Sequence, residues 1–434
     1  MKYWNIGFLW VCLSLSPLAS ADLGIQHWVT SKGATVYFVP SPDLPMIDIN
    51  VVFDAGSARD GHQAGLAKLT NALLDQGAGT LNADQIADAI DNVGAQLGNS
   101  SLRDMATVSL RSLTDPALFD PALAVFAQIL QAPTFSADAY TRIKQQLLAI
   151  VEKQKESPRS IAALKFYAAM YGDHPYASPT TGTTASLAQI TRADVAAYYQ
   201  RYYVAKNALV AIVGAVSREQ AESIAETLTQ HLAVGQAAAK LPEPKALTQS
   251  QVIRVDFPSS QSHVYVGQPG MHRTEPDYLP LYLGNHSLGG SGLVSILAEE
   301  IREKRGLSYS VYSAFSPMAQ KGPFLAGLQT KNTQVDEALA VLMSTLTDFI
   351  QAGPTEAQLT ASKNNIIGGF ALRVDSNAKI LGYLAVIGFY GLPLDYVDTF
   401  IARTRAVSRE QIRTALQKHL QPQHMVTVIV GGKL

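Results

Sequence analysis

Residues 47–74, IDINVVFDAGSARDGHQAGLAKLTNALL, contain the pattern that decides the fold. Apolar residues stand at every second position from 47 to 53, and this alternation predicts a half-buried β-strand. The turn at residues 54–57 follows. Leu66, Leu69 and Leu73 then recur three or four residues apart, which predicts an amphipathic helix over residues 65–74.

The second half of the chain repeats this kind of pattern. Residues 263–267, HVYVG, predict a strand, and long helical patterns cover residues 136–155 and 336–350. Helices grouped beside a mainly antiparallel sheet are typical of a layered α+β architecture. We therefore predict an α+β fold.

An internal repeat relates the two halves. Residues 190–192 (ITR) resemble residues 407–409 (VSR), an offset of 217 (407 minus 190), and the same offset places residues 211–214 (AIVG) on 428–431 (VIVG). Thr191 and Ser408 are the predicted N-caps of the two matching helices. Duplication explains the match, and convergence on common helix patterns is the alternative.

A second match has an offset of 219 and pairs Tyr171-Gly172 with Tyr390-Gly391. Two homologous domains are therefore expected, each a mainly antiparallel sheet packed against helices. Residues 235–251, rich in alanine and proline, predict an exposed linker. The predicted organisation is a signal peptide at 1–21, a first domain at 22–234, the linker, and a second domain at 252–434.

Composition and the N-terminus limit the possible functions. The chain has 434 residues, is 47% hydrophobic and has a formal net charge of −1, which predicts a large core and gives no overall case for nucleic-acid binding. Lys2, the apolar run after it and Ala19-Ser20-Ala21 predict a cleaved export signal, with Asp22 as the mature N-terminus. A membrane anchor is the alternative, but the run is shorter than the ~20 residues a span needs.

The expected location is therefore the periplasm or the exterior, and no later segment predicts a membrane span. Cys12 is the only cysteine and lies in the signal. The mature chain is thus predicted to have no disulfide and no thiol nucleophile.

Residues 53–80 resemble the strand, turn and active-site helix of the M16 zinc peptidases, the pitrilysin and mitochondrial-processing-peptidase-like family. That family carries His-x-x-Glu-His on this helix, where two histidines bind zinc and the glutamate is the base for a zinc-bound water. The resemblance places Lys68 at the first histidine, Asn71 at the glutamate and Ala72 at the second histidine.

None of these three side chains can replace its counterpart. Lysine repels a dication, alanine has no donor atom and asparagine cannot accept a proton from water near neutral pH. The family's third ligand should fall near residues 148–151, which are apolar, and Glu152 alone cannot form a site. We therefore expect no metal and no cofactor in this chain, with zinc in a partner subunit.

The second half keeps a motif that the first half has lost. Residues 289–293, GGSGL, precede a predicted helix over residues 295–305, and Gly306 and a strand follow. This segment resembles the M16 C-terminal motif. The resemblance implies that Arg302 and Tyr309 hold substrate and help to stabilise the oxyanion, a role in which one donor contributes roughly 3 kcal/mol.

The pattern of loss and retention predicts a function. The resemblance implies an M16 half-clamshell that pairs with a related subunit carrying intact His-x-x-Glu-His and hydrolyses unfolded peptides. The alternative is a non-catalytic chamber that binds peptides or serves a structural role. Catalysis by this chain alone is a third possibility, which predicts an isolated activity that a chelator removes.

Overall fold

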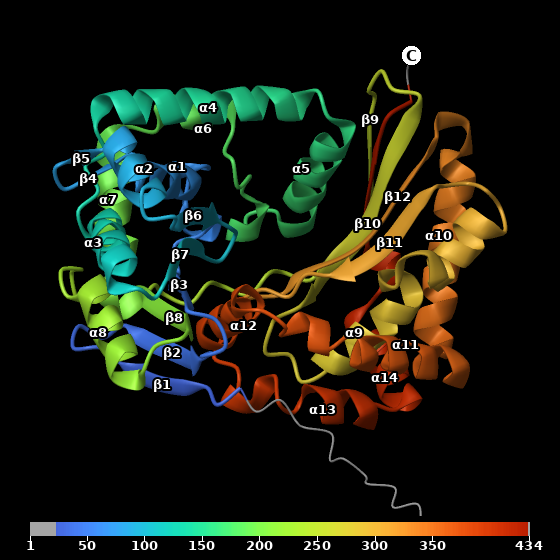
Figure 1. Ribbon diagram of the computed structural model, residues 1–434. Coiled ribbons are helices and arrows are strands. Elements are labelled where there is room, and N and C mark those ends of the chain that lie inside the picture. Colours follow the sequence, from blue (N-terminus) through green and yellow to red (C-terminus); the bar gives the residue numbers. More distant parts are fainter. Residues whose placement is uncertain (1–22, 433–434) are drawn as a thin grey trace, which may run out of the picture.

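The strand predicted at residues 47–53 is β3 (Met46–Phe53), a central strand of the first of two large sheets. The computed structural model describes residues 23–432, and in it the two large sheets lie in two domains side by side (Figure 1). The predicted signal peptide and Asp22 lie outside these residues. Within them, no helix is both long enough and apolar enough to cross a bilayer.

The strands and helices of the first half follow one another in mixed order. Its strands are β1 (Gln26–Val29), β2 (Thr35–Pro40), β3, β4 (Gly77–Ala78), β5 (Leu81–Asn82), β6 (Gln96–Ser101), β7 (Ala106–Leu113) and β8 (Ala208–Gly214). Its helices are α1 (Leu66–Leu73), α2 (Ala83–Asp91), α3 (Pro116–Gln131), α4 (Ala137–Lys155), α5 (Pro158–Tyr171), α6 (Thr184–Gln189), α7 (Arg192–Tyr202) and α8 (Arg218–Thr229).

The second half has fewer strands and equally long helices. Its strands are β9 (Gln251–Val255), β10 (Gln261–Met271), β11 (Ser310–Phe315), β12 (Gly322–Lys331) and β13 (Val426–Val430). Its helices are α9 (Tyr278–Asn285), α10 (Val335–Ala352), α11 (Glu356–Gly368), α12 (Asn377–Tyr390), α13 (Phe400–Ala406) and α14 (Arg409–His419). Two π-helical segments, η4 (His286–Gly290) and η6 (Ala298–Glu303), lie between α9 and β11.

The two large sheets share the same order over five strands, and the first sheet has β1 as an additional edge strand. The first runs β1-β2-β8-β3-β7-β6, and the second, read from its β9 edge, runs β9-β13-β10-β12-β11. Each contains one parallel pair at the equivalent place, β2 with β8 and β9 with β13, while the other pairs are antiparallel. The predicted two-domain α+β fold, with mainly antiparallel sheets, is confirmed.

The helices follow the predicted repeat as well. Helices α7 and α14 begin one residue after Thr191 and Ser408, and both residues form the capping boxes that satisfy the first free N–H groups. The offset of 217 relates both ends of α7 to both ends of α14. The offset of 219 likewise relates α5 to α12. Shared ancestry of the halves stays a prediction, and the shared topology is what it predicts.

One helix of each domain packs on the sheet of the other domain. Helix α5 packs on β10 and β13 of the second sheet, and α12 packs on β3 and β8 of the first (Figure 1). The approach is close: a Cβ at Gly388 of α12 would lie 2.0 Å from Leu209 Cδ1, and Phe166 of α5 lies 5.9 Å, ring to ring, from Tyr265. This exchange joins the domains through their cores.

The packing of α12 on the first sheet corrects one prediction. The alternation in residues 47–53 predicted a half-buried strand, yet Asp48 and Val52, on the other face, are also buried. Val52 belongs to the core that contains Leu384 of α12, whereas Ile49 packs in the core under α1. The second face is covered because a helix from the other half of the chain lies on it.

The predicted linker has no regular structure and is mostly exposed, but it is fixed at several points. Leu241 is buried, Arg59 donates from Nη1 to Ala239 O at 2.7 Å, and His174 Nε2 lies 2.9 Å from Pro242 O. The predicted linker therefore runs along the domain junction and is held there by these contacts.

Candidate functional site

Helix α1, which would carry the metal ligands, begins at a buried carboxylate. Gly65 precedes it with φ +95°, and Asp60 accepts hydrogen bonds from the N–H groups of Gly65 (2.8 Å) and Ala67 (2.7 Å). Asp60 is 4% exposed, and its burial raises its pKa to about 7, although both backbone donors favour the ionised form. The carboxylate thus fixes the start of the helix from inside the protein.

The raised pKa of Asp60 predicts a pH-dependent stability. Because its folded pKa exceeds the ordinary value of 3.8, the folded state binds the extra proton between these values, and stability falls as pH rises from about 4 to about 7, by up to about 4 kcal/mol. Urea unfolding at pH 5 and pH 8 covers about two of these three pH units and should show a decrease of about 3 kcal/mol. The Asp60→Asn variant should show a smaller decrease, and an equal decrease in both proteins would contradict the assignment.

The three positions of the lost zinc motif lie on α1 as predicted, and they have other roles. Asn71 is 2% exposed, and its Nδ2 donates to Thr107 O at 3.2 Å and lies 3.5 Å from the Tyr203 hydroxyl. Ala72 packs against the apolar core of the first domain. Lys68 is half-buried, and within residues 23–432 its ammonium has no hydrogen bond or ion pair.

Residues 148–151, where the resemblance places the family's third zinc ligand, lie on α4, which packs against α1. Val151 is buried there and Ile150 is 44% exposed. Glu152 is exposed and already engaged, because its Oε1 lies 2.7 Å from Lys155 Nζ and 2.8 Å from Thr184 Oγ1. The three motif positions on α1 and this part of α4 therefore offer no set of donor atoms that could bind a dication.

Restoring the motif on α1 alone should not restore a metal site. We expect the variant Lys68→His/Asn71→Glu/Ala72→His to bind no more zinc than the unaltered chain, because two histidines without a third ligand hold the ion weakly. Metal analysis after dialysis compares the two proteins. One additional equivalent of zinc in the variant would show that the third ligand has been misplaced.

In the second half of the chain, the Arg302 side chain contacts the main chain of Tyr309. Arg302 ends in a guanidinium whose Nη1 lies 3.4 Å from Tyr309 O, and its Nε lies 3.2 Å from Glu303 Oε1. Tyr309 stands just before β11, and its side chain is 84% exposed. Both residues belong to the second domain, whereas α1 belongs to the first (Figure 1).

The backbone around this pair is unusual. The predicted helix over residues 295–305 is π-helical in η6 and stops at Gly306 (φ +63°), whose N–H donates to Arg302 O. The glycine-rich segment before it is also π-helical in η4. Gly289 allows this close packing, since a Cβ there would lie 2.4 Å from Ser313 N. Such wide turns are rare and occur frequently at functional sites.

Sequence reasoning missed a polar network at the domain junction. Asp104, in the turn between β6 and β7, accepts from the hydroxyls of Tyr176 (2.6 Å) and Tyr390 (3.0 Å) and from Ala319 N–H (2.8 Å). The equivalent tyrosine of the other half, Tyr171, donates to Lys321 O at 3.0 Å. The repeat at Tyr171-Gly172 and Tyr390-Gly391 was the signal that marked these two tyrosines as equivalent, but it does not identify their hydrogen-bond partners.

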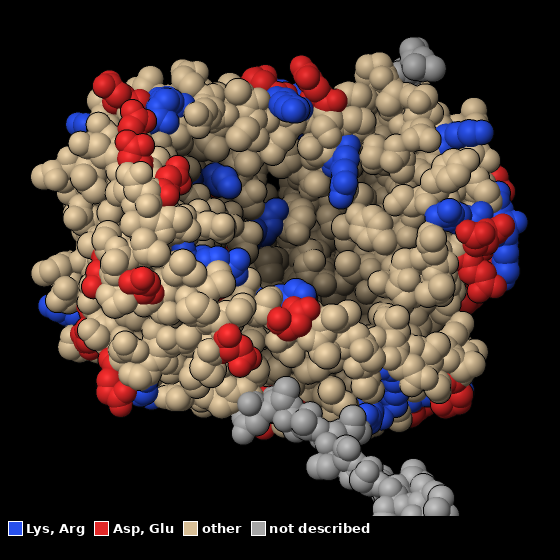
Figure 2. All heavy atoms as spheres, in the orientation of Figure 1, with Lys and Arg blue, Asp and Glu red and all other residues tan. Residues whose placement is uncertain are grey.

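The junction also carries a hollow. Figure 2 shows the molecule hollowed between its two halves, with Lys and Arg side chains around the opening. A pocket of about 400 Å³ lies at the junction; among its lining residues are Arg59, Lys240, Arg273, Gln320 and Tyr390. An open pocket between two domains is a common place for a ligand to bind.

Two family models match successive parts of the chain. The family model described as insulinase (peptidase family M16) matches residues 36–184, and that of the peptidase M16 inactive domain matches residues 189–366. The chain belongs to the M16 peptidase family. It is an inactive-type member, in agreement with the absence of zinc ligands on α1.

Individual M16 proteins match over nearly the whole chain. The crystal structure of a peptidase M16 inactive domain from Pseudomonas fluorescens is 40% identical, covers 95% of this chain and 99% of its own, and gives a TM-score of 0.92. The non-peptidase homolog YmxG of Helicobacter pylori is 26% identical over 90% of both chains. An uncharacterized zinc protease, YmxG of Bacillus subtilis, is 24% identical over 82% of this chain and 86% of its own.

Proposed function

We propose that this M16 chain is the non-zinc subunit of an exported metallopeptidase and supplies Arg302 and Tyr309 to the zinc site of a related partner chain. The observation that carries the proposal is the contrast between the two domains. Helix α1 has lost every metal ligand, while the second domain keeps an exposed tyrosine and an arginine whose guanidinium contacts the main chain of that tyrosine. A chain that served only as a scaffold would have no reason to keep that pair.

The geometry of the pair suits a role in trans. The contacts of Arg302 within this chain are long, at 3.2 and 3.4 Å, so its guanidinium can turn toward another ligand at little cost. The exposed Tyr309 hydroxyl is a second donor. Both can donate to an oxygen that becomes negative during peptide hydrolysis, and such donors act most strongly once a partner excludes water from them.

The first domain supplies a place for the peptide. Strand β6 is the outer strand of the first sheet and packs beside α1. An unfolded peptide can add to such an edge as a further strand, through hydrogen bonds that do not depend on its sequence. This mode of binding suits an enzyme for unfolded peptides.

The same edge supports a second candidate, a chamber that binds peptides without hydrolysing them. Asn71, at the position of the family's base, is buried and hydrogen-bonded to Thr107, so peptide bound on β6 would meet no catalytic group from this chain. In this case Arg302 and Tyr309 would affect peptide binding but would have no reaction to promote.

Purification of the complex from its native source decides between these functions. We expect a second M16 chain with intact His-x-x-Glu-His to co-purify, zinc to be held at its motif, and peptide hydrolysis to need both chains. A complex with peptide affinity and no hydrolysis would favour the chamber. Chelator-sensitive hydrolysis by the isolated chain would show that it acts alone.

A further inference from the structure

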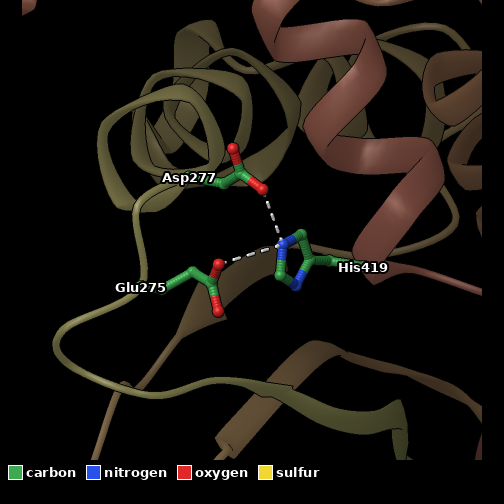
Figure 3. Close-up of side chains that lie close together, drawn as sticks. All are labelled: Glu275, Asp277 and His419. Carbon is green, nitrogen blue, oxygen red and sulfur yellow. Dashed lines mark hydrogen bonds and ion pairs between the residues drawn. The ribbon is translucent and has the colours of Figure 1, made fainter.

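Three side chains of the second domain converge on one point that the function above does not use. Glu275 and Asp277 lie in the loop between β10 and α9, and His419 is the last residue of α14 (Figure 3). His419 Nε2 lies 3.0 Å from Asp277 Oδ2 and 3.6 Å from Glu275 Oε1. One donor atom from each residue lies within 4.8 Å of the others.

These separations match those around a small metal ion. A tetrahedral zinc ion with ligand bonds of roughly 2.0–2.2 Å places its donor atoms about 3.3 Å apart. The distances from His419 Nε2 to the two carboxylate oxygens lie on either side of that value. One imidazole and two carboxylates are also ligands that zinc accepts.

Glu275 provides an independent reason to expect a cation. Its side chain is 8% exposed, yet within residues 23–432 no hydrogen bond reaches its carboxylate; the nearest nitrogens stand at 3.3 Å (His272), 3.6 Å (His419) and 3.8 Å (Lys418). These ion-pair distances are longer than the charge-assisted hydrogen bonds that a carboxylate normally accepts. The present partners therefore hold the Glu275 carboxylate only loosely.

The Asp277 side chain also points toward His419 and not toward the N–H groups of its own helix. It is the N-cap residue of α9, a position where an aspartate normally accepts from its own helix, but its side chain makes no such bond. It faces His419 and Lys418 instead. Burial opposes its ionisation, but the hydrogen bonds from those two residues outweigh burial and lower its pKa, so it carries a charge at neutral pH.

The surroundings can adapt to an ion. Lys418 Nζ lies 2.6 Å from Asp277 Oδ2, but its side chain is 60% exposed and can swing into water. His272 Nε2 lies 3.3 Å from Glu275 Oε2, on the other oxygen of that carboxylate, so Oε1 stays available to an ion. The C-terminal end of α14 adds the partial negative charge of the helix dipole.

We propose that Glu275, Asp277 and His419 bind one zinc ion, which ties the β10–α9 loop to the end of α14. Asp277 and His419 are 142 residues apart in the sequence, so no local spacing could have indicated the site. The site lies in the second domain, away from α1, and the proposal departs from the sequence-based expectation that this chain binds no metal. Zinc binds the lone pair of an unprotonated Nε2, so any proton on Nε2 of His419 must leave that atom, and Lys418 is displaced from Asp277.

Calorimetric titration of the chelator-treated chain with ZnCl₂ at pH 7.5 tests the proposal. We expect one zinc per chain, and at least tenfold weaker binding in both His419→Ala and the nearly isosteric Glu275→Gln. Lys418→Met should bind at least as tightly as the unaltered protein, because a competing cation is removed. His231→Ala, which removes an exposed histidine of the first domain, should leave binding unchanged.

The outcomes separate this site from an ordinary ion-pair cluster. Absence of zinc binding, or binding that Glu275→Gln and His419→Ala leave intact, would overturn the proposal and leave His419 as an ion-paired residue. Weaker binding by Lys418→Met would overturn it as well. Because the titration uses the isolated chain, its result does not depend on the partner or on the role of Arg302 and Tyr309.

Discussion

Replacing Asp104 by alanine is expected to lower the free energy of unfolding by about 4 kcal/mol. The change leaves three donors without an acceptor: the hydroxyls of Tyr176 and Tyr390 and the N–H of Ala319. Each buried donor left unsatisfied costs roughly 1–3 kcal/mol, and relief of the burial that raises the pKa of Asp104 offsets part of the total. Urea unfolding measures the loss.

Two further variants separate the network from a general effect of lost charge. Tyr390→Phe removes one donor and should cost about 1 kcal/mol. Asp43→Ala removes an exposed carboxylate and should change stability by less than about 0.5 kcal/mol. If Asp104→Ala were no more harmful than Asp43→Ala, the network would not hold the domains together.

Replacing Arg302 by alanine should reduce peptide hydrolysis by the assembled complex about 10²-fold in kcat. The loss of one preorganised donor to the oxyanion raises the barrier by roughly 3 kcal/mol. Tyr309→Phe removes only a hydroxyl and should have an effect of the same kind. Both side chains lie at the surface, so the folded chain and its assembly should survive either change. Steady-state kinetics and size-exclusion chromatography measure the two properties.

Lys304→Ala is the matched control for this pair. Lys304 lies next to the same segment and is half-exposed, and its ammonium is paired with Glu299 and Glu300, so its loss should leave kcat unchanged. Full activity of both the Arg302→Ala and Tyr309→Phe complexes would refute the role in trans. A loss of activity that follows a loss of assembly would instead make the segment part of the subunit interface.

The elements that the sequence predicted well are those with strong local signals. The helices at residues 136–155 and 336–350 are observed as α4 and α10, and the caps at Thr191 and Ser408 are in place. Apolar periodicity and capping act within a few residues, so the sequence alone reveals them. The strand at residues 47–53 was also found, but its second buried face was not, because α12 comes from the other half of the chain.

The candidate site likewise has features that the sequence predicted and features that it could not predict. The loss of ligands at Lys68, Asn71 and Ala72 could be seen in the sequence, since the ability to bind a metal depends on residue type. The juxtaposition of Arg302 and Tyr309 follows from their closeness in the chain. The contacts of Asp104 with Tyr390 and of Asp277 with His419 could not be predicted, because nothing local links residues so far apart.

The sequence by itself determined the two-part organisation of this protein, the type of each principal element and the absence of zinc ligands on its first helix, since these depend on local pattern and side-chain chemistry. Only the tertiary structure decided which helix covers which sheet. It also decided which residues form hydrogen bonds across the domain junction and which distant carboxylates lie beside His419. Those outcomes arise from long-range packing, in which burial of apolar surface from two halves brings together polar groups that the chain order keeps apart.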